Sequence, residues 1–237
     1  VSVINTATNT VTATITVGDG PSGIEFDSAN NRMYVANYNA GTVSVINTAT
    51  NTVTATITVG SGPNGIAFDS VNNRMYVANI GAGTVSVIDT ATNTVIDANG
   101  VDAAGTAIDV GNGPWGIAFD SVNNRMYVTN RSDDTVSVIN TATNTVTATI
   151  TVGTGSRGIA FDSANNRMYV TNYNAGTVSV IDTSDNTVTG PITVGDGPYG
   201  IEFDSANNRM YVANYNAGTV SVINTATNTV TATITVG

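Results

Sequence analysis

Two loop positions differ from copy to copy in an otherwise constant repeat, and they carry the side chains best suited to binding chemistry. The residue before each Gly-Ile pair is Ser22, Asn64, Trp115, Arg157 or Tyr199. The second position is Tyr38, Ile80, Arg131, Tyr173 or Tyr215. Aromatic rings beside Arg suit stacking on a sugar ring or anchoring of a peptide, because the rings bury a large area and the guanidinium donates several hydrogen bonds. The candidate ligand-binding residues are therefore Trp115, Arg157, Tyr199, Asn64, Arg131, Tyr38, Tyr173 and Tyr215. Drift at tolerant loop positions would explain the same variation without a ligand.

The residues needed for most nucleophilic and metal chemistry are missing from the chain. It has no His and no Cys, and its seven basic residues are all Arg. This composition excludes Ser-His and Cys-His nucleophile pairs, Cys/His zinc clusters, Schiff-base lysines and a Walker lysine. We therefore predict that the protein is not an enzyme and that it has neither a cofactor nor a metal site.

Carboxylates are the remaining candidates for acid–base chemistry. Glu25 and Glu202 occupy equivalent positions in two repeats, where the other repeats have Ala. A close pair of carboxylates is the machinery of glycoside hydrolysis. No other acid–base residue supports that reaction, so a solvated or Arg-paired charge is the preferred interpretation.

The glycine-rich and Asp/Asn-rich segments have simpler structural explanations. The loop at residues 18–23 and its copies precede strands rather than helices, so no helix N-terminus is available to hold a phosphate. The segment at residues 27–32, Asp-Ser-Ala-Asn-Asn-Arg, predicts an Asx turn in which Asp27 binds its own backbone. Arg32 and its counterparts are expected to pair with the nearby Asp.

These residues belong to near-identical repeats with a period of 42 residues, as between Met33 and Met75. A fixed period of this size indicates a repeat architecture. We predict a single domain over residues 1–237. It would consist of an N-terminal half-blade hairpin, 1–18, and repeat units 19–60, 61–111, 112–153, 154–195 and 196–237.

Each unit contains four short segments rich in Val, Ile, Thr and Tyr and bounded by Gly, Asn, Asp or Pro, which is typical of strands joined by hairpins. In the first unit the expected strands are 24–27, 31–37, 42–47 and 52–59. The second strand is apolar on both faces, which indicates a sheet between neighbouring sheets. A four-stranded meander of this length is the size of one β-propeller blade. We therefore predict an all-β fold, a β-propeller of four-stranded antiparallel blades, with about five full blades plus one extra two-stranded outer hairpin. In such a blade both variable loops emerge on one rim.

The motifs resemble those of the YVTN family of β-propeller repeats over essentially the whole chain. Tyr127-Val128-Thr129-Asn130 and Tyr169-Val170-Thr171-Asn172 carry the name motif, and Gly-Thr-Val-Ser-Val-Ile and Gly-Pro-x-Gly-Ile segments accompany it. The resemblance implies a surface-layer-like propeller, often of seven blades, in an extracellular or cell-surface location. It implies no particular ligand.

The charge balance restricts the partners. The net charge is −10, which repels nucleic-acid phosphates and anionic lipid. No apolar run approaches the ~18–20 residues that a transmembrane helix needs. We expect no nucleic-acid partner and no membrane insertion.

The terminal hairpins raise a question of blade count. Residues 1–18 are identical to residues 220–237, so two copies of one hairpin compete for one place in a ring. Either five blades close and one hairpin is left over, or the ring is incomplete, or the spare hairpin docks on another copy. Because an exposed edge recruits partners, we predict a homo-oligomer formed through the terminal hairpin.

Nine extra residues lengthen the third unit, between the segments 95–97 and 107–110. Asp97, Asn99 and Asp102 resemble part of a calcium loop, but the closing Glu and the spacing are missing. A solvated surface loop in or beside the outermost strand is the preferred interpretation.

The predicted function is that of a non-catalytic extracellular or cell-surface module that binds a glycan or a protein through the variable rim. The alternative is a structural surface or assembly protein, or an engineered repeat scaffold. Such a protein would self-associate through its terminal hairpin and have no small-molecule ligand.

Overall fold

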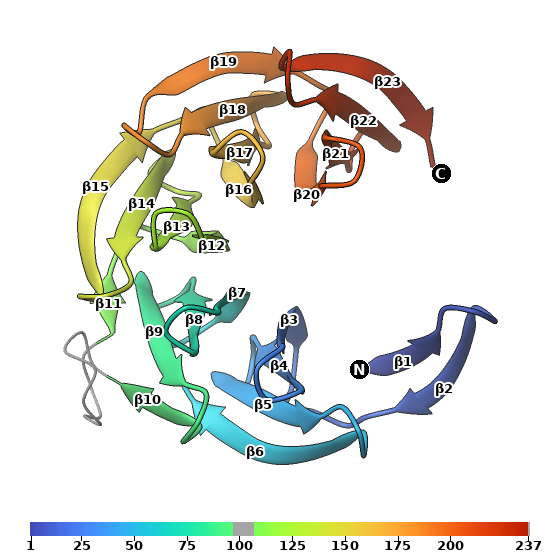
Figure 1. The fold of residues 1–237 in the computed structure, drawn as a ribbon, viewed down its shortest axis with the longest axis vertical. Coiled ribbons are helices and arrows are strands. Elements are labelled where there is room, and N and C mark those ends of the chain that lie inside the picture. Colours follow the sequence, from blue (N-terminus) through green and yellow to red (C-terminus); the bar gives the residue numbers. More distant parts are fainter. Residues whose placement is uncertain (97–106, 237) are drawn as a thin grey trace. The chain divides into compact units, whose positions relative to one another are not determined.

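The computed structural model describes residues 1–96 and 107–236 of the chain. In these ranges the regular elements are all β-strands, joined by tight turns into antiparallel meanders (Figure 1). This part of the chain contains no helix that is long and apolar enough to cross a membrane. The chain divides into two compact units, Val1–Ile108 and Asp109–Gly237.

The first unit holds one hairpin and two larger sheets. The hairpin pairs β1 (Ser2–Asn5) with β2 (Thr10–Thr14). The next sheet has the order β3 (Pro21–Asp27), β4 (Arg32–Asn37), β5 (Thr42–Asn47) and β6 (Thr52–Thr58). The last sheet consists of β7 (Pro63–Asp69), β8 (Arg74–Asn79), β9 (Thr84–Asp89) and β10 (Thr94–Ile96), and the short β11 (Ile108–Asp109) also pairs with β9.

The second unit holds three four-stranded sheets. The first has the order β12 (Pro114–Asp120), β13 (Arg125–Asn130), β14 (Thr135–Asn140) and β15 (Thr145–Thr151). The next has β16 (Ser156–Asp162), β17 (Arg167–Asn172), β18 (Thr177–Asp182) and β19 (Val188–Thr193). The last has β20 (Pro198–Asp204), β21 (Arg209–Asn214), β22 (Thr219–Asn224) and β23 (Thr229–Thr235).

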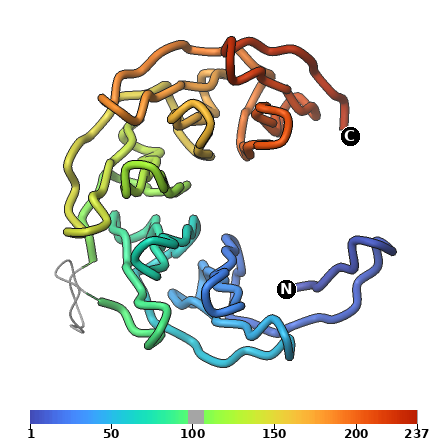
Figure 2. Tube along the Cα trace, in the orientation of Figure 1, coloured from blue at the N-terminus to red at the C-terminus, as the bar shows by residue number. Residues whose placement is uncertain are grey.

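The repeated four-stranded sheets are those of a β-propeller, which confirms the predicted fold class (Figure 2). The extra residues of the third unit fall where the fourth strand is divided into β10 and β11. Asp97, Asn99 and Asp102 lie outside the described residues. The prediction of a solvated loop there stays a prediction.

One expectation about the strands is corrected by the structure. The first strand of each sheet begins about three residues earlier than the sequence suggested, at Pro21 rather than Ile24 in β3. A shift in register between Pro21 and Ile24 accommodates the additional residues as a bulge. The equivalent bulges in β12, β16 and β20 contain Trp115, Arg157 and Tyr199, which were expected in a loop.

The turns between the first two strands are held by the predicted Asx geometry. In the second unit, Asp120 Oδ1 accepts the backbone N–H groups of Val122 and Asn123 at 2.9 and 3.1 Å. Asn124 then adopts the left-handed conformation with a φ of 53°, which Asn tolerates better than most residues. The Asp and Asn side chains of these turns therefore have structural roles.

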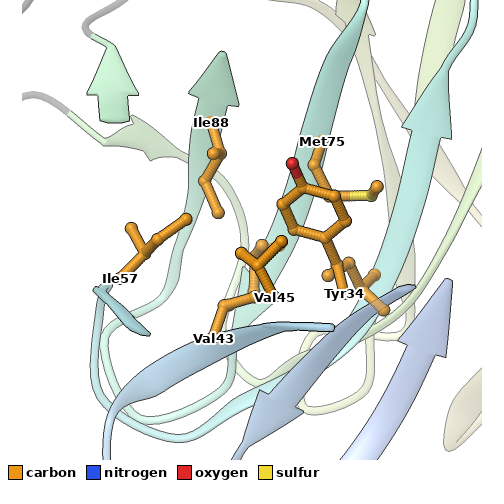
Figure 3. Packing of buried hydrophobic residues seen from close by; sticks show 8 residues of the cluster. Tyr34, Val43, Val45, Ile57, Met75 and Ile88 are labelled. Atoms are coloured by element: carbon orange, nitrogen blue, oxygen red, sulfur yellow. The ribbon is translucent and has the colours of Figure 1, made fainter. Parts of the chain in front are cut away.

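Each sheet buries apolar side chains against its neighbour. Tyr34, Val43, Val45 and Ile57 of one sheet pack against Ile66, Met75, Val77 and Ile88 of the next (Figure 3). In the second unit, Met168 of β17 packs towards Tyr127, while the adjacent Tyr169 packs towards Met210 on the other face. Burial on both faces confirms that these sheets are sandwiched, as the sequence of the second strand indicated.

Hydrogen bonds across the sheets accompany this packing. Arg125 Nη1 donates to the carbonyl oxygen of Thr183 at 3.1 Å, and the hydroxyl of Tyr127 donates to Asn186 Oδ1 at 2.9 Å. Arg167 and Tyr169 make equivalent bonds to Thr225 and Asn228. The Arg of each motif thus binds the turn between the last two strands of the next sheet, whereas the sequence suggested a nearby Asp as its partner.

These buried tyrosines predict a loss of stability in alkali. Burial raises the pKa of Tyr127 and of Tyr169 to about 12, whereas an exposed Tyr titrates near ~10. The folded state retains protons that the unfolded chain loses, so the free energy of unfolding falls between about pH 10 and pH 12, by up to about 1.4 kcal/mol per pH unit for each Tyr. Urea titrations across this range should show the slope flattened by Tyr127→Phe with Tyr169→Phe but not by Tyr215→Phe, whose ring is exposed. An unchanged slope in the double variant would contradict this assignment.

Close approach of neighbouring first strands predicts a glycine requirement. A methyl group on Gly158 would overlap the carbonyl oxygen of Tyr199, while the equivalent Gly200 has no atom within 4 Å of that position. Gly158→Ala should lower the free energy of unfolding by about 1–3 kcal/mol, the usual cost of overpacking. Gly200→Ala is the matched control and should leave denaturant midpoints within error. Equal effects of the two changes would show that strand spacing is not the cause.

Candidate functional site

The candidate site is a group of aromatic and Arg side chains on the second unit. We call it the aromatic–arginine cluster and define it as Trp115, Arg131, Arg157, Tyr173, Tyr199 and Tyr215. Trp115, Arg157 and Tyr199 come from the bulges of β12, β16 and β20, which are neighbouring first strands. Arg131, Tyr173 and Tyr215 each follow directly after a second strand, β13, β17 or β21.

Backbone hydrogen bonds bring the two sets of residues together. The N–H of Tyr173 donates to the carbonyl oxygen of Gly155 at 3.0 Å, and that of Tyr215 donates to Gly197 at 2.9 Å. Gly155 has a φ of 72°, in the left-handed region where Gly is favoured. Each loop after a second strand is thereby fixed beside the loop that leads into the first strand, as the sequence predicted for the two variable positions.

Two Thr residues add a link between neighbouring sheets. Thr129 Oγ1 donates to the carbonyl oxygen of Arg157 at 2.6 Å, and Thr171 Oγ1 donates to that of Tyr199 at 3.0 Å. The same hydroxyls accept the N–H groups of Gly116 and Gly158, at 2.9 and 2.8 Å. Sequence reasoning missed this role, although the signal was present, because only these two repeats have Thr where the other three have Ala.

Arg157 is the centre of the cluster. Its guanidinium carbon lies 3.7 Å from the ring centroid of Tyr173, 4.7 Å from that of Tyr199 and 5.2 Å from that of Trp115. These distances are within the range of cation–π attraction. Partial burial, together with the charge of Arg131, lowers the pKa of Arg157. Its Nε is buried and has no hydrogen-bond partner among the described residues.

The rings pack edge to face around this guanidinium. Tyr199 lies 5.8 Å from Trp115 with an interplanar angle of 86°, and 6.2 Å from Tyr173 with an angle of 83°. Tyr215 lies 6.3 Å from Tyr199 and is largely exposed. The hydroxyl of Tyr173 donates to Asn216 Oδ1 at 3.0 Å, which fixes that ring. Such contacts hold the rings in place before a ligand arrives.

The cluster borders an open cavity of about 390 Å³, lined by Arg157, Tyr173, Tyr199 and Tyr215. Arg131 is on the other side of Trp115, with its guanidinium carbon 5.4 Å from that ring. Two Arg side chains thus give a local positive charge to a chain whose net charge is −10. The site can stack a flat ring and donate hydrogen bonds to an oxygen atom of that ring.

The remaining candidates lie elsewhere. Asn64 is in β7 and Tyr38 follows β4, so both belong to the first unit. Glu25 is half-buried in β3, where its Oε1 accepts the N–H of Phe26 at 3.1 Å, and Glu202 is exposed in β20. Among residues 1–96 and 107–236, no three side chains of the His, Cys, Asp or Glu type gather as a metal site would require.

Comparison with known proteins gives the family. The sequence profile of the family described as lactonase, 7-bladed β-propeller, matches residues 47–193, which is more than half of the chain. The chain belongs to this seven-bladed β-propeller lactonase family. No curated protein matches the sequence.

A solved structure shares the fold. The chain is similar to Kuenenia stuttgartiensis hydrazine synthase with a TM-score of 0.52 and 15% sequence identity, covering 91% of this chain and 98% of that one. At this identity the likeness concerns the fold alone. The prediction that the protein is not an enzyme is wrong, because the family that it belongs to is named for an enzyme and this structural neighbour is also one.

The order of the cluster can be tested with its own fluorophore, since Trp115 is the sole Trp of the chain. Tyr199→Ala removes a ring that packs against the indole and should shift the Trp emission to longer wavelength by admitting water. Tyr38→Ala, in the first unit, is the matched control and should leave the spectrum unchanged. An identical spectrum for Tyr199→Ala would contradict the contact.

Proposed function

We propose that this protein binds a carbohydrate-derived ring at the aromatic–arginine cluster, in an extracellular or cell-surface setting. The observation that carries the proposal is the ordered set of Tyr173, Tyr199 and Tyr215 rings around the Arg157 guanidinium at an open cavity. Its volume of about 390 Å³ lies within the ~300–1,000 Å³ usual for small-molecule sites. The cell-surface setting rests on the resemblance of the repeats to the YVTN family.

The chemistry of the cluster defines the ligand. Tyr199 and Tyr215 present exposed ring surface, against which the apolar C–H face of a sugar ring packs well. Arg157 then donates to a ring or carbonyl oxygen through its N–H groups. A lactone ring combines both features, and the family name points to that class of compound. A peptide held by the same aromatic residues is the competing occupant.

Lactone-ring opening is the second candidate function, and the family match is the observation that favours it. Water would add to the lactone carbonyl carbon, the ring C–O bond would break, and the product would be a hydroxy acid. The Arg157 guanidinium would donate a hydrogen bond to the carbonyl oxygen, where negative charge develops during attack. The sequence has no His, Cys or Lys to act as base, which leaves carboxylates or water for that role.

Binding is tested by titration calorimetry with a neutral oligosaccharide, an aldonolactone, its hydroxy acid and an unrelated peptide. We expect a ring compound to bind, and Tyr199→Ala to weaken its affinity at least about tenfold, which corresponds to ~1.4 kcal/mol. Arg157→Met should weaken the lactone and the acid more than the neutral sugar. Tyr38→Ala is the control and should bind like the parent chain.

Two results would overturn the binding proposal. One is folded protein that binds no member of the panel, and the other is binding of the peptide alone. Ring opening is measured separately by acid release from the aldonolactone. Release no faster than in buffer would dismiss the second candidate, while a faster rate that Arg157→Met removes would support it.

A further inference from the structure

Two exposed faces of this chain have matching chemistry. One is the face of the β20–β23 sheet that contains Tyr211, Val220, Val222 and Ile234, which we call the donor face. The other is the face of the β1–β2 hairpin that contains Ile4, together with the turn at Thr6 and Asn9, which we call the acceptor face. The contacts of the neighbouring sheets show how such faces fit together.

The donor face is the counterpart of a surface that is covered in the preceding sheet. Ile192 of β19 is 7% exposed, whereas the equivalent Ile234 of β23 is 46% exposed. Tyr169 is fully buried, while the equivalent Tyr211 is only half-buried. Arg209 is also exposed, although the equivalent Arg167 is half-buried and binds the next sheet. The donor face therefore presents a Tyr and an Arg of the kind that bind turns elsewhere.

The acceptor face is the counterpart of what covers the preceding sheet. Tyr169 and Arg167 donate to Asn228 Oδ1 and to the carbonyl oxygen of Thr225, both in the turn between β22 and β23. Residues 1–18 repeat that hairpin letter for letter, so Thr6 and Asn9 are the equivalents of Thr225 and Asn228. Ile4 is 58% exposed, whereas its equivalent Ile223 is fully buried against Tyr169, Val178 and Val180.

The hairpin already has the conformation that this contact needs. Its register pairs Ile4 with Val11 and has a bulge after Val3, as β22–β23 pairs Ile223 with Val230 and has a bulge after Val222. Asn9 has a φ of 53°, close to the 55° of Asn228. The opposite face of the hairpin is in use, because Ile15 packs on Val35 and Ile46 of the adjacent sheet.

We propose that the donor face of one copy binds the acceptor face of a second copy. Tyr211 would donate to Asn9 Oδ1 of the second copy and Arg209 to the carbonyl oxygen of Thr6, with Ile4 packed against Val222 and Ile234. A second copy is the occupant because Ile4 and Ile234 both stay exposed within one chain. The contact is head-to-tail, so copies can add in series. It buries only two strands of a four-stranded partner, so association depends on concentration.

The test is the solution mass by sedimentation or light scattering over a concentration series. The parent chain should gain mass with concentration. Ile4→Asp and Ile234→Asp each place a carboxylate on one exposed face and should leave monomers. Val122→Asp, at a comparably exposed position on another turn, is the control and should associate like the parent. Asn9→Gly keeps the left-handed turn, removes the acceptor of Tyr211 and should weaken association.

Mixing the two monomeric variants gives the sharpest result. The Ile4→Asp chain retains its donor face and the Ile234→Asp chain retains its acceptor face, so an equal mixture should form one dimer and grow no further. A parent chain that stays monomeric at its solubility limit would overturn the proposal. So would association that survives Ile4→Asp, or a mixture that remains monomeric while the parent associates.

Discussion

Burial of both faces of each sheet is the constraint on which the rest of this structure depends. Met168 and Tyr169 are neighbours in β17, point to opposite faces and are both fully buried, each by a different adjoining sheet. A single four-stranded sheet of this sequence would expose one of those faces to water. The hydrogen bonds of Tyr and Arg to the turn of the next sheet exist because the apolar packing brings those groups together, and they fix how the sheets are aligned.

This constant scaffold explains how variable residues come to form a site. Trp115, Arg157 and Tyr199 are equivalent in three successive repeats, so the stacking of sheets makes them neighbours. Thr129 and Thr171 then fix the strands that carry Arg157 and Tyr199 by bridging backbone groups of adjacent sheets. The outcome is a positively charged group held among aromatic rings on an acidic protein.

Family membership and residue composition bear on the chemistry in different ways. The family is named for lactone hydrolysis, while the chain lacks the side chains that most hydrolytic nucleophiles and bases require. Arg157 is the group whose position suits both binding and polarisation of a carbonyl, because partial burial strengthens its electrostatic interactions. The cluster is therefore the place where binding and catalysis can be separated by experiment.

The sequence by itself determined the four-stranded repeat, the Asx turns and the face on which the variable residues gather. These features follow from local periodicity, from turn chemistry and from comparison of one repeat with another. Tertiary structure alone decided that Arg157 stands between Tyr173, Tyr199 and Trp115, and that the motif Arg binds the turn of the next sheet rather than its own Asp. The bulge that carries Trp115 was also invisible, because an additional residue in a strand has no signature in residue type. The physical reason is common to all three, since they depend on distances between segments that meet only when the sheets stack.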